Sequence, residues 1–504
     1  MSVQRVGFAL LALVAVARPG PSAPVPAAKL PAPLPAATVA AWVKAGAEVG
    51  WMNWDAVNEL RFHTDAPRPG DVPAFRFKDW RPGLFTALPA PVQPFGLDLD
   101  AVKIDDGLEE LAGFEWLHSL DLGGRTVTDN GLKHIAGLTG LQALDLSNTW
   151  VSSAGLKHLT ALKRLRFLGL WRQFISDAGL KHLAALTELQ NLELGFTQVT
   201  GPGLKELVPL HNLRRLSLNS TPLGDDGVPH VVELKQLRAL NLVGTKVTVA
   251  GLKRLAALPE LRRLDTQSAG DAELEELGRF AKLERLTGWQ GTVTGTGLKH
   301  IAGLTELREL WLVDVGLRGA GLEHLARLHK LEVLDLSANW RLPEAEFRHL
   351  VPLKHLRSLK LRSMPLTDEG AKYLAGLSEL EVLDLLAAKV TDAGAKHLAG
   401  LVRMRELNLA STLIGDDGLK ELIGMKRLES LDLAATPVTN AGLWHLAAFP
   451  ELRTLDLRGT AITPTGLTHL AALKQLRTVR ISGQATLGTA DLRKALPECK
   501  VYAE

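Results

Sequence analysis

A phrase of the form Leu-x-x-Leu-x-Leu recurs at intervals of mostly 24 residues along this chain of 504 residues. A fixed period of this length means that one supersecondary unit is stacked on copies of itself. Such an array grows in one dimension and does not divide into separate globular domains. The phrase, or a close variant, occurs sixteen times, beginning at Leu117, Leu141, Leu165, Leu189, Leu213, Leu237, Leu261, Leu283, Leu307, Leu331, Leu356, Leu380, Met404, Leu428, Leu452 and Leu476.

Each repeat contains the signals of one short strand and one helix. In the phrase that begins at Leu141, alternation predicts a strand with Leu144 and Leu146 inward and Ala143 and Asp145 outward. A later Ser-Asp or Thr-Asp pair marks a helix start, because the hydroxyl caps free N–H groups and the carboxylate faces the positive end of the helix dipole. The unit therefore predicts an α/β solenoid.

The helical half of each repeat predicts that the solenoid is curved. Leu180, Leu183 and Leu186 form an apolar stripe on a helix of about ten residues. A glycine such as Gly179 recurs in its first turn, and because glycine is a poor helix residue we infer that a neighbouring repeat approaches closely there. Strands stack ~4.8 Å apart and helices ~8–10 Å apart, so the stack should bend into an arc with a concave parallel sheet.

The repeats resemble leucine-rich repeat proteins, specifically the bacterial helical type similar to the GALA and ribonuclease-inhibitor-like groups. Residues 331–339 match the hallmark LxxLxLxxN, and Thr is the commonest residue at the last place in the other copies, as at Thr149, Thr221 and Thr436. The resemblance covers residues 92–501 and implies about 16 repeats of 24 residues. It also implies recognition of a protein or another macromolecule on the concave face.

The residues before the repeats predict three segments. Arg5, the apolar run from Val6 to Ala17 and the small residues around Val16 predict a signal peptide in residues 1–17, with an uncleaved interfacial anchor as the alternative. The run of twelve residues is too short to cross a ~30 Å hydrocarbon core, and no other segment reaches transmembrane length. Residues 18–37 are rich in Pro and Ala and predict an extended linker.

Residues 38–91 carry no repeat but are rich in Trp and Phe. An open solenoid end would expose core leucines, so we interpret this segment as the N-terminal cap, with a small independent binding module as the alternative. A short helix is expected from Thr38 to Ala47 and a strand from Pro73 to Phe77. Residues 92–504 form the repeat domain, which a helix and strand from about residue 487 should close.

Composition narrows the classes of function. The 58 basic and 55 acidic residues nearly balance, and no Lys/Arg block stands out, so nothing indicates binding to nucleic acid. The single cysteine, Cys499, excludes an intrachain disulfide. The chain has no GxSxG, HExxH, P-loop or Cys-His arrangement, and the repeats leave no room for a catalytic domain. We expect no enzyme activity and no cofactor.

Aromatic residues at outward positions are the candidate binding site. Most outward positions are small or acidic, and large rings with an arginine are typical of binding hot spots. The alternative is that some of the rings fold over the strand edge and cover neighbouring side chains. A first cluster contains Phe167, Trp171, Arg172 and Phe196, with Trp150 and Phe174 on the adjoining loop edge, and a second contains Trp289 and Trp311.

Two features suggest metals but are better explained otherwise. Ten histidines occupy one helix position, including His134, His349 and His397. Equivalent positions lie ~8–10 Å apart, too far for two neighbours to share a zinc ion, so we expect a solvated ladder, with a cationic face below about pH 6 as the alternative. Acidic pairs such as Asp105-Asp106 stand at the helix cap and lack the further oxygen ligands of a calcium site. The sequence predicts no metal.

One interval is shorter than the others. Leu261 and Leu283 are 22 residues apart, and Thr266 and Gly288 stand where inward leucines are expected. We expect a thinner core and a softer joint there, either through sequence drift or as a functional bend.

Together these observations predict a non-enzymatic, exported protein that binds a macromolecule, most simply a protein, on its concave face. A structural component of the cell envelope is the main alternative, and an adaptor of a ubiquitin-ligase-like effector is a remote one, since no F-box-like segment is present. Neither the ligand nor the oligomeric state follows from the sequence.

Overall fold

The computed structural model describes residues 30–54, 60–289 and 291–503. The predicted signal peptide and most of the predicted linker lie outside these residues. Within them, one sheet of 21 strands runs from β2 through β1 and β3 to β4, and then in chain order to β21. The two pairings of β1 are antiparallel, and the later ones are parallel. The sheet is open, which confirms the predicted solenoid.

A strand lies at each of the sixteen phrases, from β5 to β20. The first strands are β1 (Glu48–Trp54), β2 (Leu60–His63), β3 (Val72–Arg76) and β4 (Phe95–Asp98). The strands at the phrases are β5 (Leu117–Asp121), β6 (Ala143–Asp145), β7 (Phe167–Gly169), β8 (Asn191–Glu193), β9 (Arg215–Ser217), β10 (Ala239–Asn241), β11 (Arg263–Asp265), β12 (Arg285–Gly288), β13 (Glu309–Leu312), β14 (Val333–Asp335), β15 (Ser358–Lys360), β16 (Val382–Asp384), β17 (Glu406–Asn408), β18 (Ser430–Asp432), β19 (Thr454–Asp456) and β20 (Thr478–Ile481). β21 (Lys500–Ala503) ends the sheet.

The helices are shorter than predicted. The repeat at Ser176 has one α-helical turn, α3, followed by a 3₁₀ turn at Leu183–Ala185 in place of ten continuous α-helical residues. No described helix has the length and apolarity needed to span a bilayer. The α-helices are α1 (Ala36–Lys44), α2 (Asp129–Leu132), α3 (Asp177–Leu180), α4 (Val228–Val232), α5 (Val249–Leu255), α6 (Asp271–Leu277), α7 (Gly295–Leu298), α8 (Asp368–Leu374), α9 (Asp392–Leu398), α10 (Asp416–Glu421), α11 (Asn440–Leu443), α12 (Pro464–Leu467) and α13 (Thr489–Ala495).

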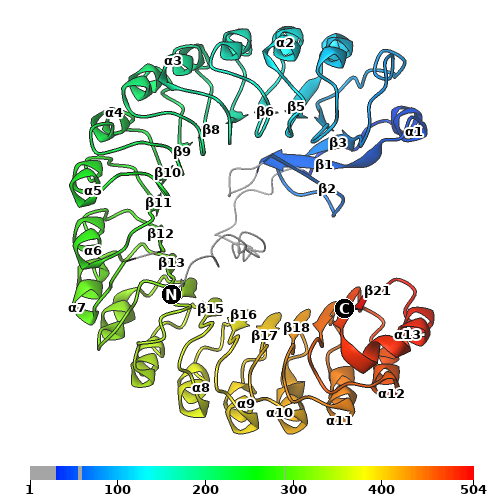
Figure 1. The fold of residues 1–504 in the computed structure, drawn as a ribbon, viewed down its shortest axis with the longest axis vertical. Coiled ribbons are helices and arrows are strands. Elements are labelled where there is room, and N and C mark those ends of the chain that lie inside the picture. The colour runs from blue at the N-terminus through cyan, green and yellow to red at the C-terminus, as the bar shows by residue number, and fades with distance from the viewer. Residues whose placement is uncertain (1–29, 55–59, 290, 504) are drawn as a thin grey trace, which may run out of the picture.

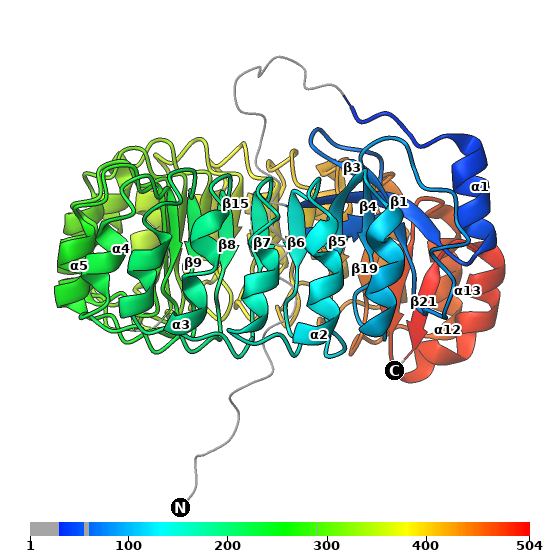
Figure 2. The same ribbon diagram turned by 90° about the horizontal axis from the view of Figure 1, so that it is seen from above.

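The solenoid curves into a nearly complete ring with the sheet on the inside and the helices on the outside (Figure 1). Seen from above, the loops that enter and leave the strands form two rims (Figure 2). The narrow spacing of strands and the wider spacing of helical turns produce this curvature. A continuous apolar core fills the space between the layers from Leu34 to Cys499.

A carboxylate joins most neighbouring repeats on the helical side. Asp368 accepts hydrogen bonds from the backbone N and the Oγ1 of Thr391 in the next repeat, at 2.8 and 2.7 Å. A Cβ on Gly394 would lie 2.3 Å from the same carboxylate, which explains the recurring glycine and confirms the close approach. The hydroxyl of Thr391 also caps its own helix at the N–H of Ala393, as predicted. We call this contact the Asp–Thr clasp.

The segment before the first parallel strands buries the end of the leucine core. Trp42 on α1 is fully buried and stacks on Phe75 with ring centroids 4.2 Å apart. Its Nε1 donates to the carbonyl of Pro89 at 3.0 Å. Four further rings surround it, those of Phe77, Phe85, Phe95 and Phe114. At the other end of the solenoid, α13 and β21 complete the last unit.

The β1–β2 hairpin leaves this end of the solenoid and lies on the concave face. Met52 and Leu60 form a second small core with Ala143 of β6 and Phe167 of β7. The hairpin packs on a row of small residues at matching positions of neighbouring strands, which includes Gly96. Gly96 has no side chain and therefore leaves room for Met52. The hairpin therefore covers the inner wall of the first repeats, and Figure 1 shows it projecting into the centre of the ring.

The short interval is closed by a local rearrangement. A Cβ on Gly288 would lie 2.3 Å from the Cβ of Ala269, so alanine fills the place left by the missing leucine. Thr266 is buried, and its Oγ1 donates to the carbonyls of Ser268 and Thr287. A hollow of about 250 Å³ remains beside Thr266. The expected thinning of the core is thus only partial.

Candidate functional site

A groove of about 720 Å³ runs along the concave face next to the hairpin. Leu60 of the hairpin contributes to its lining, and residues that follow or belong to β4 through β12 form the rest. Its floor consists of outward positions of the strands, which the repeat keeps in register from one unit to the next.

One part of the groove is acidic. Asp100, Asp121, Asp145 and Glu193 line it. Burial, followed by the charges of Asp145 and Asp98, raises the pKa of Asp121 well above its usual range. The Gly123 N–H, which donates to Asp121 at 2.9 Å, opposes this shift only in part.

The other part of the groove is basic. Arg215, Arg263 and Arg285 stand at the same outward position of β9, β11 and β12. Arg285 contacts carboxylates on both sides, with Asp265 at 3.4 Å and Glu309 at 3.7 Å. The groove thus offers a negative and a positive wall to one occupant.

Trp171, Arg172 and Phe196 lie together at the edge of the groove. The Trp171 and Phe196 rings meet edge to face at 5.2 Å, and the Arg172 guanidinium lies 5.9 Å from the Trp171 ring. Trp171 lines the groove, and Phe196 remains 47% exposed. Arg172 and Phe196 have φ values of 58° and 55°, a left-handed turn that recurs after most strands and points their side chains outward.

Phe167 is not an exposed anchor, and the expectation was wrong at this residue. Its side chain is fully buried, because the hairpin covers it. Trp54 of β1 stacks on the Phe167 ring at 6.4 Å and on the His118 ring at 6.2 Å. The outward position was read correctly, but a segment more than one hundred residues earlier in the sequence occupies the space above it. Phe167 holds the hairpin.

Trp150 and Phe174 form a separate pair on one rim. Their rings stack at 5.9 Å with an interplanar angle of 9°, and they are 50% and 58% exposed. The Trp150 Nε1 donates to the carbonyl of Arg125 at 3.1 Å, which fixes that ring. The residues of the first predicted cluster therefore lie in three separate places. The Phe167 ring is buried under the hairpin, the group around Trp171 lies at the edge of the groove, and Trp150 and Phe174 form a pair on the rim.

The two residues of the second predicted cluster differ in position. Trp311 stands on the concave side of β13, and Arg285 lies over its ring at 4.5 Å, with the Lys360 Nζ at 6.0 Å. Its ring is thus partly covered, as the alternative reading expected. Trp289 follows β12 and is 39% exposed. Trp311 borders the basic part of the groove through its contact with Arg285.

The histidine ladder lies on the helical side. The side chains of its members are half-buried rather than fully solvated. Burial and neighbouring lysines lower the pKa of His158 and of His182. These two rings therefore gain their charge at a lower pH than a free imidazole, which weakens the alternative of a cationic face below about pH 6.

The sequence reading overlooked the basic wall. Arg215, Arg263 and Arg285 occupy the first outward position of their strands, and comparison of that position across repeats would have revealed them. No sequence pattern predicted that the hairpin packs on the inner wall, because this packing depends on a contact between segments that are distant in the sequence.

Comparisons with known proteins agree with this architecture. A family model described as leucine-rich repeat region matches residues 180–412, and a second one, described as leucine rich repeat, matches residues 404–422 and 451–471. No curated protein matches the chain significantly.

Three solved structures are similar to this chain at low sequence identity. The leucine-rich repeat protein LIC12759 of Leptospira interrogans has 21% sequence identity and a TM-score of 0.44, with 84% of this chain and 99% of that chain covered. An internalin of Listeria monocytogenes has 19% identity and a TM-score of 0.42, with coverage of 69% and 88%. TLR13, solved in complex with the RNA ssRNA13, has 19% identity and a TM-score of 0.50, with coverage of 81% and 69%. The family matches and the repeating strand-and-helix units together show that the chain belongs to the leucine-rich repeat family.

Proposed function

We propose that this protein binds a protein partner through the concave groove that lies next to the hairpin and extends to β12. The observation that carries the proposal is the groove itself, which combines an acidic wall, an arginine wall and the Trp171–Phe196 edge. Complementary charges steer a partner and fix its register, whereas partly exposed aromatic rings supply the contact area of a hot spot. A volume of about 720 Å³ fits a protruding loop or a terminal segment.

The proposal includes export and the absence of catalysis. Residues 1–17 support export by their sequence pattern, which N-terminal sequencing of the mature protein tests: the first residue should follow Ala17. The motif content and the repeat architecture support a role in binding rather than in catalysis. The envelope-scaffold alternative places the contacts on the linker or the helical face.

Substitutions on the groove test the proposal. The full chain is immobilised and used to capture partners from the native envelope fraction, and the bound species are quantified for wild type, Trp171→Ala and Arg263→Glu. Trp340→Ala is the matched control, since this tryptophan is 63% exposed and does not line the groove. We expect both groove variants to lose the same protein partner while the control retains it.

The outcome distinguishes the alternatives. Equal capture by all the variants, with folding intact by circular dichroism, contradicts the groove and favours the scaffold. A nuclease-sensitive partner would contradict the expectation that nucleic acid does not bind, a case made relevant by the RNA complex of TLR13.

A further inference from the structure

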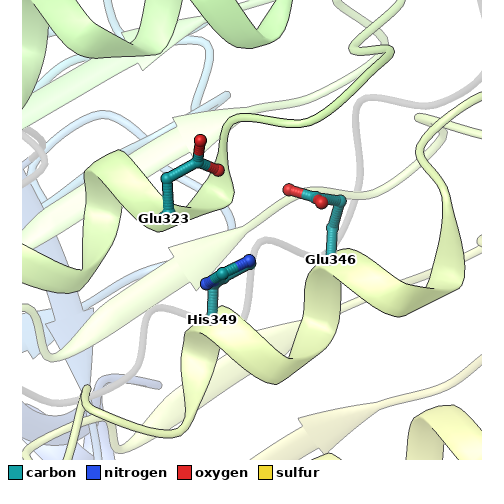
Figure 3. A group of neighbouring side chains, drawn as sticks. All are labelled: Glu323, Glu346 and His349. Carbon is teal, nitrogen blue, oxygen red and sulfur yellow. The ribbon is translucent and has the colours of Figure 1, made fainter.

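Three side chains with metal-binding atoms meet on the helical side at one junction between repeats. Glu323 lies on the 3₁₀ turn Leu322–Arg327, and Glu346 and His349 lie on the next one, Glu344–Leu350. One ligand atom of each residue lies within 4.8 Å of the other two. Figure 3 shows the three side chains converging on the space between the two turns.

The junction departs from the Asp–Thr clasp. Gly319 stands where most repeats have the clasp carboxylate. A Cβ at Gly319 would meet no atom of the described residues within 4 Å, so none of their side chains takes the place of the missing carboxylate at this position. At two other such junctions, Gly201 with Gly227 and Gly295 with Gly321, two glycine backbones close the gap. At the junction that begins at Gly319, a side chain, that of Glu346, occupies the glycine place, as Glu273 does in the repeat after Val249.

Glu346 reaches back toward the preceding repeat. Its Oε2 accepts hydrogen bonds from the backbone N–H groups of Gly321 at 2.9 Å and Leu322 at 3.1 Å. The side chain is only 4% exposed, so its charge lies in a poorly solvated place. Neutral backbone donors, rather than a lysine or an arginine, hold it. A buried carboxylate in this setting gains from a nearby cation.

The charge beside Glu346 is also reversed. Glu323 occupies the position at which many repeats carry a lysine, for example Lys299 and Lys372. The substitution places a second carboxylate, rather than a cation, next to Glu346 and the ladder residue His349. Three departures from the repeat pattern, at 319, 323 and 346, thus coincide at one junction.

We propose that Glu323, Glu346 and His349 bind one divalent transition-metal ion, with Zn²⁺ as the best match. One imidazole and two carboxylates are a donor set that Zn²⁺ accepts, with water as the fourth ligand, whereas Ca²⁺ and Mg²⁺ favour oxygen ligands alone. The ion would join two repeats where the Asp–Thr clasp is missing. Its positive charge would neutralise the negative charges of Glu323 and Glu346 together.

One neighbour competes with the metal. Arg348 Nε lies 3.2 Å from the Nε2 of His349, so the guanidinium places a positive charge next to the site. Arg348 is exposed, and its side chain can turn into solvent when the metal binds. Removal of this cation should therefore strengthen binding.

Metal titration of the full chain tests the inference. The protein is stripped with a chelator and titrated with Zn²⁺ alone in competition with a chromophoric indicator, and Co²⁺ absorption reports the coordination. We expect one site that is weakened at least about tenfold by Glu323→Gln and by His349→Gln. Arg348→Ala should bind more tightly. His397→Gln, at the same ladder position in a repeat with the normal clasp, should bind as wild type does.

Equal affinities of the His349→Gln and His397→Gln variants, or Zn²⁺ binding only at millimolar concentrations, would overturn the proposal. Glu323 and Arg348 are exposed, so these variants keep the fold, which circular dichroism verifies. The titration needs no partner and is independent of the proposed function.

Discussion

At the scale of single residues, the carboxylate of Asp121 on the inner wall lies in surroundings that disfavour its negative charge. Asp121 is crowded by other carboxylates, and its raised pKa shows that the fold disfavours its charged form. Asn241 and Asn408 occupy the equivalent position in other repeats and accept the same local backbone hydrogen bond, at 3.0 and 2.9 Å. The acidic residue is therefore not required by the turn, which is consistent with a role in binding.

The substitution Asp121→Asn should stabilise the protein at pH 7 by about 1 kcal/mol. The amide keeps the bond from Gly123 and removes the repulsion. Because the folded-state pKa of Asp121 is raised, its ionisation lowers stability as the pH rises through that pKa. The gain should thus disappear below about pH 4, where Asp is protonated in both states. Urea unfolding at both pH values checks this, and a gain that persists at low pH contradicts it.

The glycines that pack against the carboxylates of the Asp–Thr clasp, such as Gly394, should not tolerate a larger side chain. In an ordinary helix, Gly→Ala is stabilising by about 1 kcal/mol. In Gly394→Ala, the new methyl would lie 2.3 Å from the Asp368 carboxylate, so we expect a loss of about 1–3 kcal/mol instead. Gly400→Ala in the same repeat meets nothing within 4 Å and is the control. Thermal unfolding compares the two, and equal stabilities would refute the steric role of the clasp.

At the scale of elements, the hairpin formed by β1 and β2 is the least expected feature of the molecule. It is held on the inner wall by Phe167 and by the stack of Trp54 on His118. Burial lowers the pKa of His118 to about 4, and the charge of Arg166 adds to this effect, while a hydrogen bond with Gln142 opposes it. The neutral imidazole is therefore part of the docked state.

Acidification should release the hairpin. The folded-state pKa of His118 is below its ordinary value of 6.5, so its contribution is complete above about pH 6.5 and is lost as the pH falls toward 4. The loss amounts to at most about 3 kcal/mol. Hydrogen exchange at residues 48–54 and 60–63 should accelerate between pH 7 and pH 4.5, after correction for intrinsic rates. His118→Phe should abolish this dependence.

Removal of the Phe167 side chain, on which the hairpin packs, provides a second test. Phe167→Ala removes the ring on which Trp54 packs, and such a loss in a core costs about 3–5 kcal/mol. We expect rapid exchange in the hairpin with unchanged protection in α8 and α9, which lie far along the solenoid. Uniform loss of protection throughout the chain would show that the hairpin is not a separate element.

At the scale of the whole molecule, the sequence predicted what repeats and failed where the chain contacts itself at long range. The leucine period predicted the strands, the inward residues and the curvature. The Thr-Asp pair predicted the helix caps, but not that the aspartate bonds the next repeat. The burial of Phe167 depends on the hairpin, and the cluster around Glu346 depends on two turns meeting across a junction. Neither contact follows from a local pattern.

The measurement that tests the central claim most directly is site-specific photo-crosslinking in cells that make the protein. A benzoylphenylalanine replaces either Phe196, at the edge of the groove, or Trp444, which is 68% exposed on the helical side. The account predicts a crosslinked partner from position 196 that is lost when Arg263→Glu is added, and none from position 444. A partner crosslinked from position 444 but not from 196 would contradict it.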